Sequence, residues 1–180
     1  MKIGLGRAFS ILVIALTVAI VPGVAAAEGT IAPVTLEDLN GKKVKVDFSS
    51  AKITLVNFWA VWCMPCRDEI PEIARLKSEY GDKGLQVFGI AMESGEPAEV
   101  KDFLERNKGF GVNYPMLMGT DEVADSFGGV MAVPTTYLLD AKGKVLKTYV
   151  GSTRDFHAKV SAEIDSTLKA PGNTQTKPAP

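Results

Sequence analysis

The chain has 180 residues, of which 46% are hydrophobic and 23% are charged, and its formal net charge is −1. This length predicts one domain, and the composition is that of a globular protein with a hydrophobic core. The near-neutral charge, without a block of like charges, argues against a nucleic-acid-binding surface. Two cysteines and one histidine are too few for a disulfide framework or for a four-ligand zinc site.

Residues 1–27 have the pattern of a secretory signal peptide. Lys2 and Arg7 precede an uncharged, mostly apolar run, and Ala25-Ala26-Ala27 supplies a small-x-small cleavage site. The alternative is an uncleaved membrane anchor, because the uncharged stretch approaches the ~20 residues that span a bilayer. Under both interpretations the folded domain, residues 28–170, is expected to be periplasmic or otherwise extracytoplasmic, where disulfides persist. Contact with a membrane is expected only if the leader is uncleaved.

Strands and helices are predicted in alternation along the rest of the chain. In chain order, the predicted elements are a hairpin with strands at 34–36 and 44–46, a strand at Ile53–Trp59, a helix at 64–80, a strand at Leu85–Ala91, a helix at 97–107, a strand at 116–118, a helix at 122–127, a second hairpin with strands at 135–139 and 144–150, and a helix at 156–168. Two continuous apolar runs with a helix between them predict a βαβ unit, whose strands are parallel. Residues 171–180 have little to bury and predict a disordered tail.

The sequence Cys63-Met64-Pro65-Cys66 directly follows the first apolar run and opens a helix. Unpaired N–H groups and the helix dipole favour a thiolate at a helix start, and the thiolate is the form that attacks a disulfide. Cys63 is therefore predicted to be the exposed nucleophile. Cys66 lies one turn later on the same face, close enough to form a disulfide with Cys63. It is expected to be more buried and to resolve the mixed disulfide.

Other roles for the cysteine pair are less consistent with the sequence. Haem attachment requires a histidine directly after the second cysteine, and Arg67 stands there. A structural disulfide that closes so short a loop would stabilise the fold little. No metal site is expected, because the one histidine, His157, is predicted to lie on the surface of the last helix.

Two runs of sequence resemble motifs of one family. The run from Asn57 to Pro71 resembles the active-site segment of the thioredoxin superfamily, and more narrowly its TlpA/ResA-like branch of extracytoplasmic thiol-disulfide oxidoreductases. Gly129–Thr136 resembles the cis-proline loop of that family, and residues 93–118 resemble the inserted helix and strand of the branch. The resemblance covers about residues 31–170. It implies a thioredoxin-like three-layer α/β fold, with a central mixed sheet flanked by helices, an N-terminal hairpin and an inserted helix-strand.

The resemblance also implies a substrate-binding surface beside the cysteines. Pro134 is expected to follow a cis peptide bond and to lie against the cysteine pair. The backbone of Val133 would then be free to pair with an extended segment of the substrate. Trp62 is expected to shield one side of the sulfur atoms, and packing in the core is the alternative.

A proton acceptor is the remaining expected component. Ordinary thioredoxins carry a buried aspartate where this chain has Asn57, which has no titrating proton. In the TlpA/ResA-like branch the glutamate three residues after the second cysteine is implicated instead, and here that residue is Glu69. The alternative is a first-turn glutamate that only suits the helix dipole, and Asp68 and Glu72 could also favour that end of the helix.

Three functions are consistent with these features. The first is a reductase of extracytoplasmic protein disulfides, such as those of apocytochrome c during cytochrome c maturation. Such an enzyme needs a membrane thiol-disulfide reductant, because the chain has no flavin or nicotinamide motif and therefore no cofactor of its own. The second is a disulfide-forming oxidant, which is disfavoured because no His or Lys stands between the cysteines and two carboxylates follow them. The third is a copper-delivery protein for oxidase assembly, which lacks a third ligand beside Cys63 and Cys66.

Overall fold

The computed structural model describes residues 29–170. The predicted signal peptide, residues 1–27, and the predicted tail, residues 171–180, lie outside the described residues. Within residues 29–170, no helix has both the length and the apolar character that crossing a bilayer requires.

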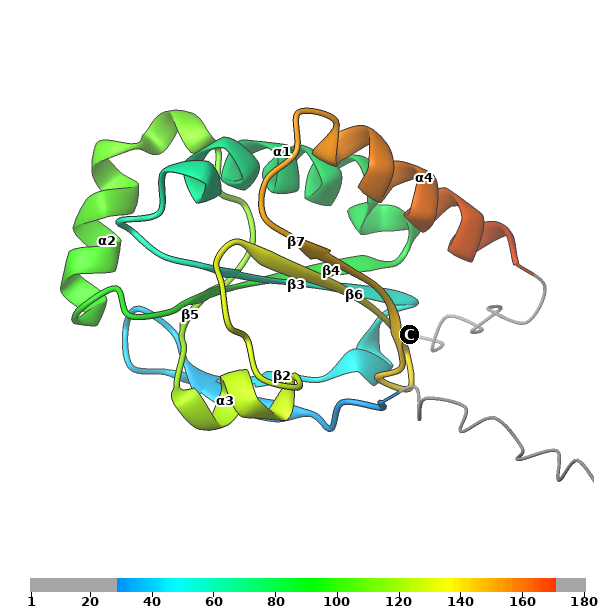
Figure 1. The fold of residues 1–180 in the computed structure, drawn as a ribbon, viewed down its shortest axis with the longest axis horizontal. Helices are drawn as coiled ribbons and strands as arrows, with labels where there is room; N and C mark the ends of the chain where they lie inside the picture. Colours follow the sequence, from blue (N-terminus) through cyan, green and yellow to red (C-terminus); the bar gives the residue numbers. More distant parts are fainter. Residues whose placement is uncertain (1–28, 171–180) are drawn as a thin grey trace, which may run out of the picture.

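The predicted elements are all present, and their ends differ from the predictions by at most one residue. They are β1 (Val34–Glu37), β2 (Lys43–Val46), η1 (Phe48–Ser50), β3 (Ile53–Trp59), α1 (Met64–Tyr80), η2 (Gly81–Lys83), β4 (Leu85–Ala91), α2 (Pro97–Arg106), η3 (Lys108–Phe110), β5 (Met116–Met118), α3 (Asp121–Ser126), β6 (Thr135–Asp140), β7 (Val145–Val150) and α4 (Phe156–Lys169) (Figure 1). The short 3-10 helices η1, η2 and η3 were not expected.

The central sheet is mixed, as expected. Its strand order is β5-β4-β3-β6-β7, and β1 and β2 form a separate antiparallel hairpin. Strand β4 runs parallel to β3 and β5, whereas β6 runs antiparallel to β3 and β7. The register of β3 on β6 pairs Asn57 with Thr136 and Phe58 with Thr135. The loop before β6 is therefore held beside the carboxyl end of β3, where the cysteine motif begins.

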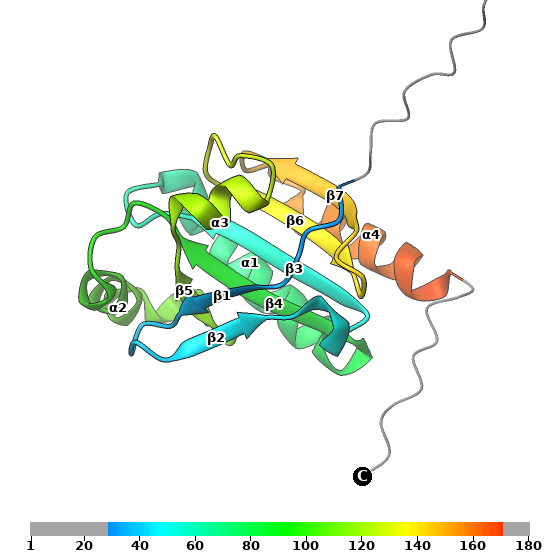
Figure 2. The same cartoon turned by 90° about the horizontal axis from the view of Figure 1, so that it is seen from below.

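The sheet lies between two layers, which the two views show from perpendicular directions. Helices α1 and α4 cover one face, and the β1–β2 hairpin and α3 lie on the other (Figures 1 and 2). Alternation along β3 sends Leu55 and Trp59 into the core under α1, and Val56 and Phe58 into the core on the hairpin side. Asn57 shares the alternation of Leu55 and Trp59, so its side chain lies on the α1 face.

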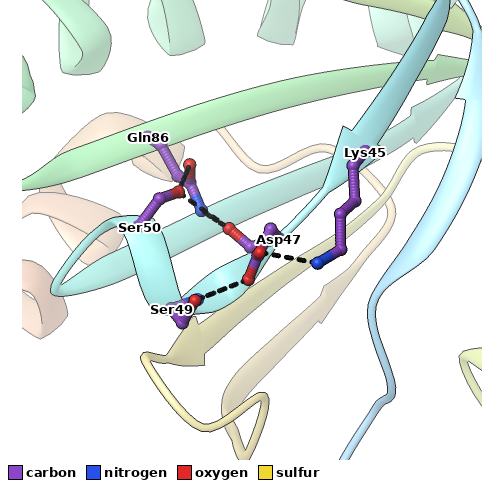
Figure 3. A network of polar contacts seen from close by, with 5 residues as sticks. All are labelled: Lys45, Asp47, Ser49, Ser50 and Gln86. Atoms are coloured by element: carbon purple, nitrogen blue, oxygen red, sulfur yellow. Dashed lines mark hydrogen bonds and ion pairs between the residues drawn. The ribbon is translucent and has the colours of Figure 1, made fainter.

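A network of polar contacts joins the hairpin to the amino end of β4 (Figure 3). Asp47 accepts hydrogen bonds from the Lys45 ammonium at 2.9 Å and the Ser49 N–H at 3.0 Å, and these bonds lower its pKa to about 2. The Gln86 amide donates to the Asp47 carbonyl at 2.7 Å, and the Ser50 hydroxyl donates to the Gln86 amide oxygen at 2.9 Å. The cysteine motif follows the opposite, carboxyl end of β3, so this network stabilises the fold away from the sulfur atoms.

Candidate active site

The two cysteines form a disulfide at the start of α1. Their sulfur atoms are 2.07 Å apart and their Cα atoms 5.3 Å apart. Cys63 is the N-cap residue, and its Sγ accepts a hydrogen bond from the Cys66 N–H at 3.2 Å. Cys66 is 1% exposed and Cys63 is 4% exposed, so their order of burial is as predicted. The prediction of an exposed Cys63 is wrong for this disulfide form, because both residues belong to the core cluster under α1.

Large apolar side chains are exposed on both motif runs. Trp62 is 58% exposed, Met64 64% and Met131 95%. The alternative prediction, that Trp62 packs in the core, is therefore wrong. Its indole N–H donates instead to the Glu93 carbonyl at 3.0 Å. Trp62 and Met64 flank Cys63 in sequence, and Met131 belongs to the proline loop. Met131 was not singled out from the sequence, because exposure of a methionine has no local sequence signal.

The proline loop has the cis peptide bond that the resemblance implied. The Val133–Pro134 peptide bond is cis. Pro134 directly precedes β6, whose first residue pairs with Phe58 near the carboxyl end of β3. Val133 packs against the core cluster that contains both cysteines. The fold therefore brings the two motif runs to the same edge of the sheet.

Glu69 is buried, whereas its two acidic neighbours on α1 are not. It is 2% exposed, and neither carboxyl oxygen has a well-formed hydrogen bond to a described residue, which leaves the nearby Thr136 hydroxyl as a weak partner. Burial raises the pKa of Glu69 to about 8, although the nearby Thr136 hydroxyl opposes the rise. Asp68 is exposed, and Glu72 pairs with Arg75 at 2.9 Å. Glu69 is thus not merely a solvated glutamate that suits the helix dipole.

Asn57 and Thr136 complete the buried polar group. Asn57 is 1% exposed, and its Nδ2 donates to the Thr136 Oγ1 at 2.9 Å. The Thr136 hydroxyl therefore lies between a carboxamide, which donates to it, and the carboxyl group of Glu69. Thr136 was not predicted as a site residue. Only the β3–β6 register, which joins positions far apart in sequence, places it there.

A cavity of about 850 Å³ reaches Glu69 from the surface between α1 and the start of α4. Pro65, Asp68 and Glu69 line it from α1, and residues 152–158 line it from the other side. His157 belongs to this wall, but its side chain is only 21% exposed and its Nε2 lies 3.3 Å from a Glu79 carboxylate oxygen. His157 lies on the last helix, as predicted, but packing of α4 on α1 leaves its side chain half-buried beside a carboxylate and not freely exposed on the surface. Among residues 29–170, no group of three or more His, Cys, Asp or Glu side chains is placed to hold a metal ion.

Known proteins are similar to this chain in sequence and in fold. Residues 28–148 match the AhpC/TSA family. The thiol-disulfide oxidoreductase ResA of Bacillus subtilis is 35% identical over 127 residues, which cover 69% of this chain and 68% of that protein. The thioredoxin-like protein YneN of the same organism is 34% identical over 141 residues, covering 77% of this chain and 80% of that protein.

A solved structure gives the same result. The thiol:disulfide interchange protein of the thioredoxin family from Chlorobium tepidum TLS superposes with a TM-score of 0.67 and 28% identity, covering 79% of this chain and 98% of that one. The Chlorobium structure shares the fold described above, that protein and ResA are both named for thiol-disulfide chemistry, and this chain has a cysteine pair at the start of α1. The chain therefore belongs to the AhpC/TSA family of the thioredoxin superfamily and is a thiol-disulfide oxidoreductase of the ResA type.

Proposed function

We propose that this oxidoreductase acts as a reductase of protein disulfides, in which Cys63 attacks the substrate and Cys66 resolves the mixed disulfide. The observation that carries the proposal is the position of the Cys63 Sγ at the N-cap of α1, where it accepts the Cys66 N–H at 3.2 Å. Backbone N–H groups and the helix dipole stabilise a negative charge at this position. Cys66, inside the first turn, receives less of this stabilisation and is the more deeply buried residue of the two.

The exchange has two steps. The Cys63 thiolate attacks one sulfur of the substrate disulfide, so that a mixed disulfide forms and the other substrate sulfur leaves as a thiolate. Cys66 then loses its proton and attacks the Cys63 sulfur, which closes the 63–66 disulfide and releases the second substrate thiolate. Two electrons pass from the enzyme dithiol to the substrate.

Glu69 is the proposed acceptor of the Cys66 proton. Burial raises its pKa to about 8 in the disulfide form, which makes the carboxylate a strong enough base to take a thiol proton and a strong enough acid to release it again near neutral pH. The cavity beside Glu69 offers a path by which the proton can later reach solvent. The exposed Asp68 has no comparable position.

Trp62, Val133 and Pro134 are the proposed substrate-binding residues. Trp62 presents an exposed apolar surface next to Cys63, and the cis Val133–Pro134 bond lies at the same edge of the sheet. An extended protein segment beside a disulfide fits this surface, because the backbone of Val133 can pair with it as an added strand. Disulfide-containing proteins are therefore the substrates that we propose.

The leader pattern of residues 1–27 supports a location outside the cytoplasm. Residues 28–170 are then the thioredoxin-like domain, and residues 171–180 are a tail. An extracytoplasmic reductase needs electrons from a membrane thiol-disulfide reductant, since this chain contributes only its own dithiol. Reduction of apocytochrome c during cytochrome c maturation is the substrate assignment that we propose within this setting.

Trapping of the mixed disulfide tests the order of attack. Cys66→Ser should accumulate a covalent complex with a disulfide-containing protein, because the resolving sulfur is lost. Cys63→Ser should accumulate none. The complex is detected by nonreducing electrophoresis, and the reverse pattern would contradict the assignment of Cys63 as the attacking sulfur.

A further inference from the structure

The residue before Trp62 is held at both of its peptide groups by side chains from elsewhere in the fold. The Val61 N–H donates to the Ser94 hydroxyl at 3.1 Å. The Val61 carbonyl accepts from the Arg67 guanidinium at 3.1 Å, and this guanidinium lies 4.9 Å from the centre of the Phe103 ring on α2. The loop between β3 and α1 is therefore fixed from two directions just before the cysteine motif.

Ser94 is suited to this role by its burial and by its second hydrogen bond. It is 3% exposed, and its hydroxyl donates to the Met92 carbonyl at 2.8 Å. Because the single hydroxyl proton is used in that bond, the oxygen faces Val61 as an acceptor. The Met92 N–H in turn donates to the Trp59 carbonyl at 2.8 Å, which ties the start of this loop to the end of β3.

The same loop also holds the Trp62 side chain. The Glu93 carbonyl accepts the Trp62 indole N–H at 3.0 Å. Glu93 has a φ of 43°, in the left-handed region that residues other than glycine seldom adopt. Backbone conformations of this kind persist where the surrounding contacts impose them, and they cluster at functional sites. Here the contact is a hydrogen bond to an exposed tryptophan next to the active-site disulfide.

We propose that Ser94 is a positioning residue for substrate recognition: by fixing Val61 and the Glu93 carbonyl, it holds Trp62 in the orientation that receives a protein substrate. The hydrogen bonds of the Ser94 hydroxyl go to Val61 and Met92, so Ser94 acts on docking rather than on the exchange itself. This inference rests on the proposed function only in taking Trp62 as part of the substrate-binding surface. It gives the loop between β4 and the inserted helix α2 a part in substrate recognition.

The test compares a protein substrate with a small one. The fully reduced chain is mixed with insulin or with hydroxyethyl disulfide, and the oxidation rate is followed as the concentration of each disulfide increases. Ser94→Ala should raise the half-saturating insulin concentration by about 2- to 10-fold, the range that corresponds to loss of one ordinary hydrogen bond. The limiting rate with insulin and the rate with hydroxyethyl disulfide should stay within about twofold of the wild type, because the sulfur atoms keep their surroundings.

Two further variants and one optical measurement separate positioning from general destabilisation. Ser94→Thr keeps the hydroxyl and should restore the insulin value. Ser126→Ala removes a serine hydroxyl that bonds within α3, away from the site, and should leave both substrates unaffected. Quenching of tryptophan fluorescence by acrylamide should increase in Ser94→Ala alone. The signal reports Trp62, because the other tryptophan, Trp59, is 0% exposed.

Three results would overturn the inference. They are an unchanged insulin value in Ser94→Ala, an equal loss of rate with both disulfides, and unchanged quenching. Each is independent of which cysteine attacks, since the trapping experiment with Cys63→Ser and Cys66→Ser decides that separately. A failure of Ser94 as a positioning residue is thereby distinguished from a failure of the proposed function.

Discussion

Replacing Glu69 with glutamine should remove a pH dependence of stability that the fold imposes on the disulfide form. The pKa of this carboxyl group is about 8 in the folded chain, against an ordinary value of 4.5. Between these two pH values the folded state holds a proton that the unfolded state has released. Stability therefore falls as pH rises through this interval, because the unfolded state binds fewer protons.

The burial of Glu69 sets the size of the effect. The interval from 4.5 to about 8 corresponds to at most about 5 kcal/mol, at about 1.4 kcal/mol for each pH unit. Relaxation of the site and entry of water through the adjoining cavity reduce this figure, so a loss of about 2–4 kcal/mol is the expected result. Glutamine has a similar shape and no titrating proton, so Glu69→Gln should lose most of this slope and be more stable than the wild type above about pH 8.

Urea unfolding of the oxidised chain at a series of pH values from about 5 to about 9 measures this slope. Asp68→Asn is the matched control, since Asp68 is the exposed neighbour on the same helix and its removal should leave the slope unchanged. Equal slopes for the wild type and Glu69→Gln would refute the assignment of the buried proton to Glu69. A change in Asp68→Asn as large as in Glu69→Gln would show only a general effect of charge at the helix start.

A second pair of variants tests the contact with Thr136. Thr136→Val removes the hydroxyl that opposes the rise in the Glu69 pKa, so the fall in stability should begin at the same pH and continue to a higher pH. Thr135→Val is the control. Thr135 is also buried, but its hydroxyl donates to the Ala132 carbonyl at 2.8 Å. Thr135→Val should lower stability by a similar amount at all pH values, and the pH range over which stability falls should stay unchanged.

Two other predictions concern the direction of electron transfer and the backbone. The reduction potential of the Cys63–Cys66 pair, measured by equilibration with a thiol-disulfide buffer, should be more negative than about −150 mV; a more positive value would place the protein among the oxidants. In urea unfolding, Gly143→Ala should destabilise the fold by about 2–4 kcal/mol and Gly128→Ala by about 1–2 kcal/mol. Both glycines have a positive φ, but only at Gly143 would an added Cβ collide with backbone, at the Ile31 carbonyl. Equal losses for the two glycines would contradict the collision.

The sequence was sufficient to predict the elements and the place of the cysteine pair. The runs Ile53–Trp59 and Leu85–Ala91 are apolar at nearly every position, which is typical of strands covered on both faces, and both are strands of those lengths. The helix after Cys63 begins at Met64, where a proline fits the first turn. These features are local, so spacing and composition along the chain are enough to predict them.

Burial and long-range contacts were decided only by the tertiary structure. Asp68, Glu69 and Glu72 are all acidic residues near the start of α1, and the sequence does not distinguish their burial. Only the packing of α1 on the sheet buries the carboxyl group of Glu69 and leaves Asp68 exposed. The bond from Val61 to Ser94 joins residues 33 apart in sequence, and the bond from Asn57 to Thr136 joins residues 79 apart. Such pairs depend on strand register and on the path of a loop in space, which no local pattern specifies. The sequence alone therefore determined where the sulfur chemistry lies, whereas the packing of distant segments determined which groups surround it.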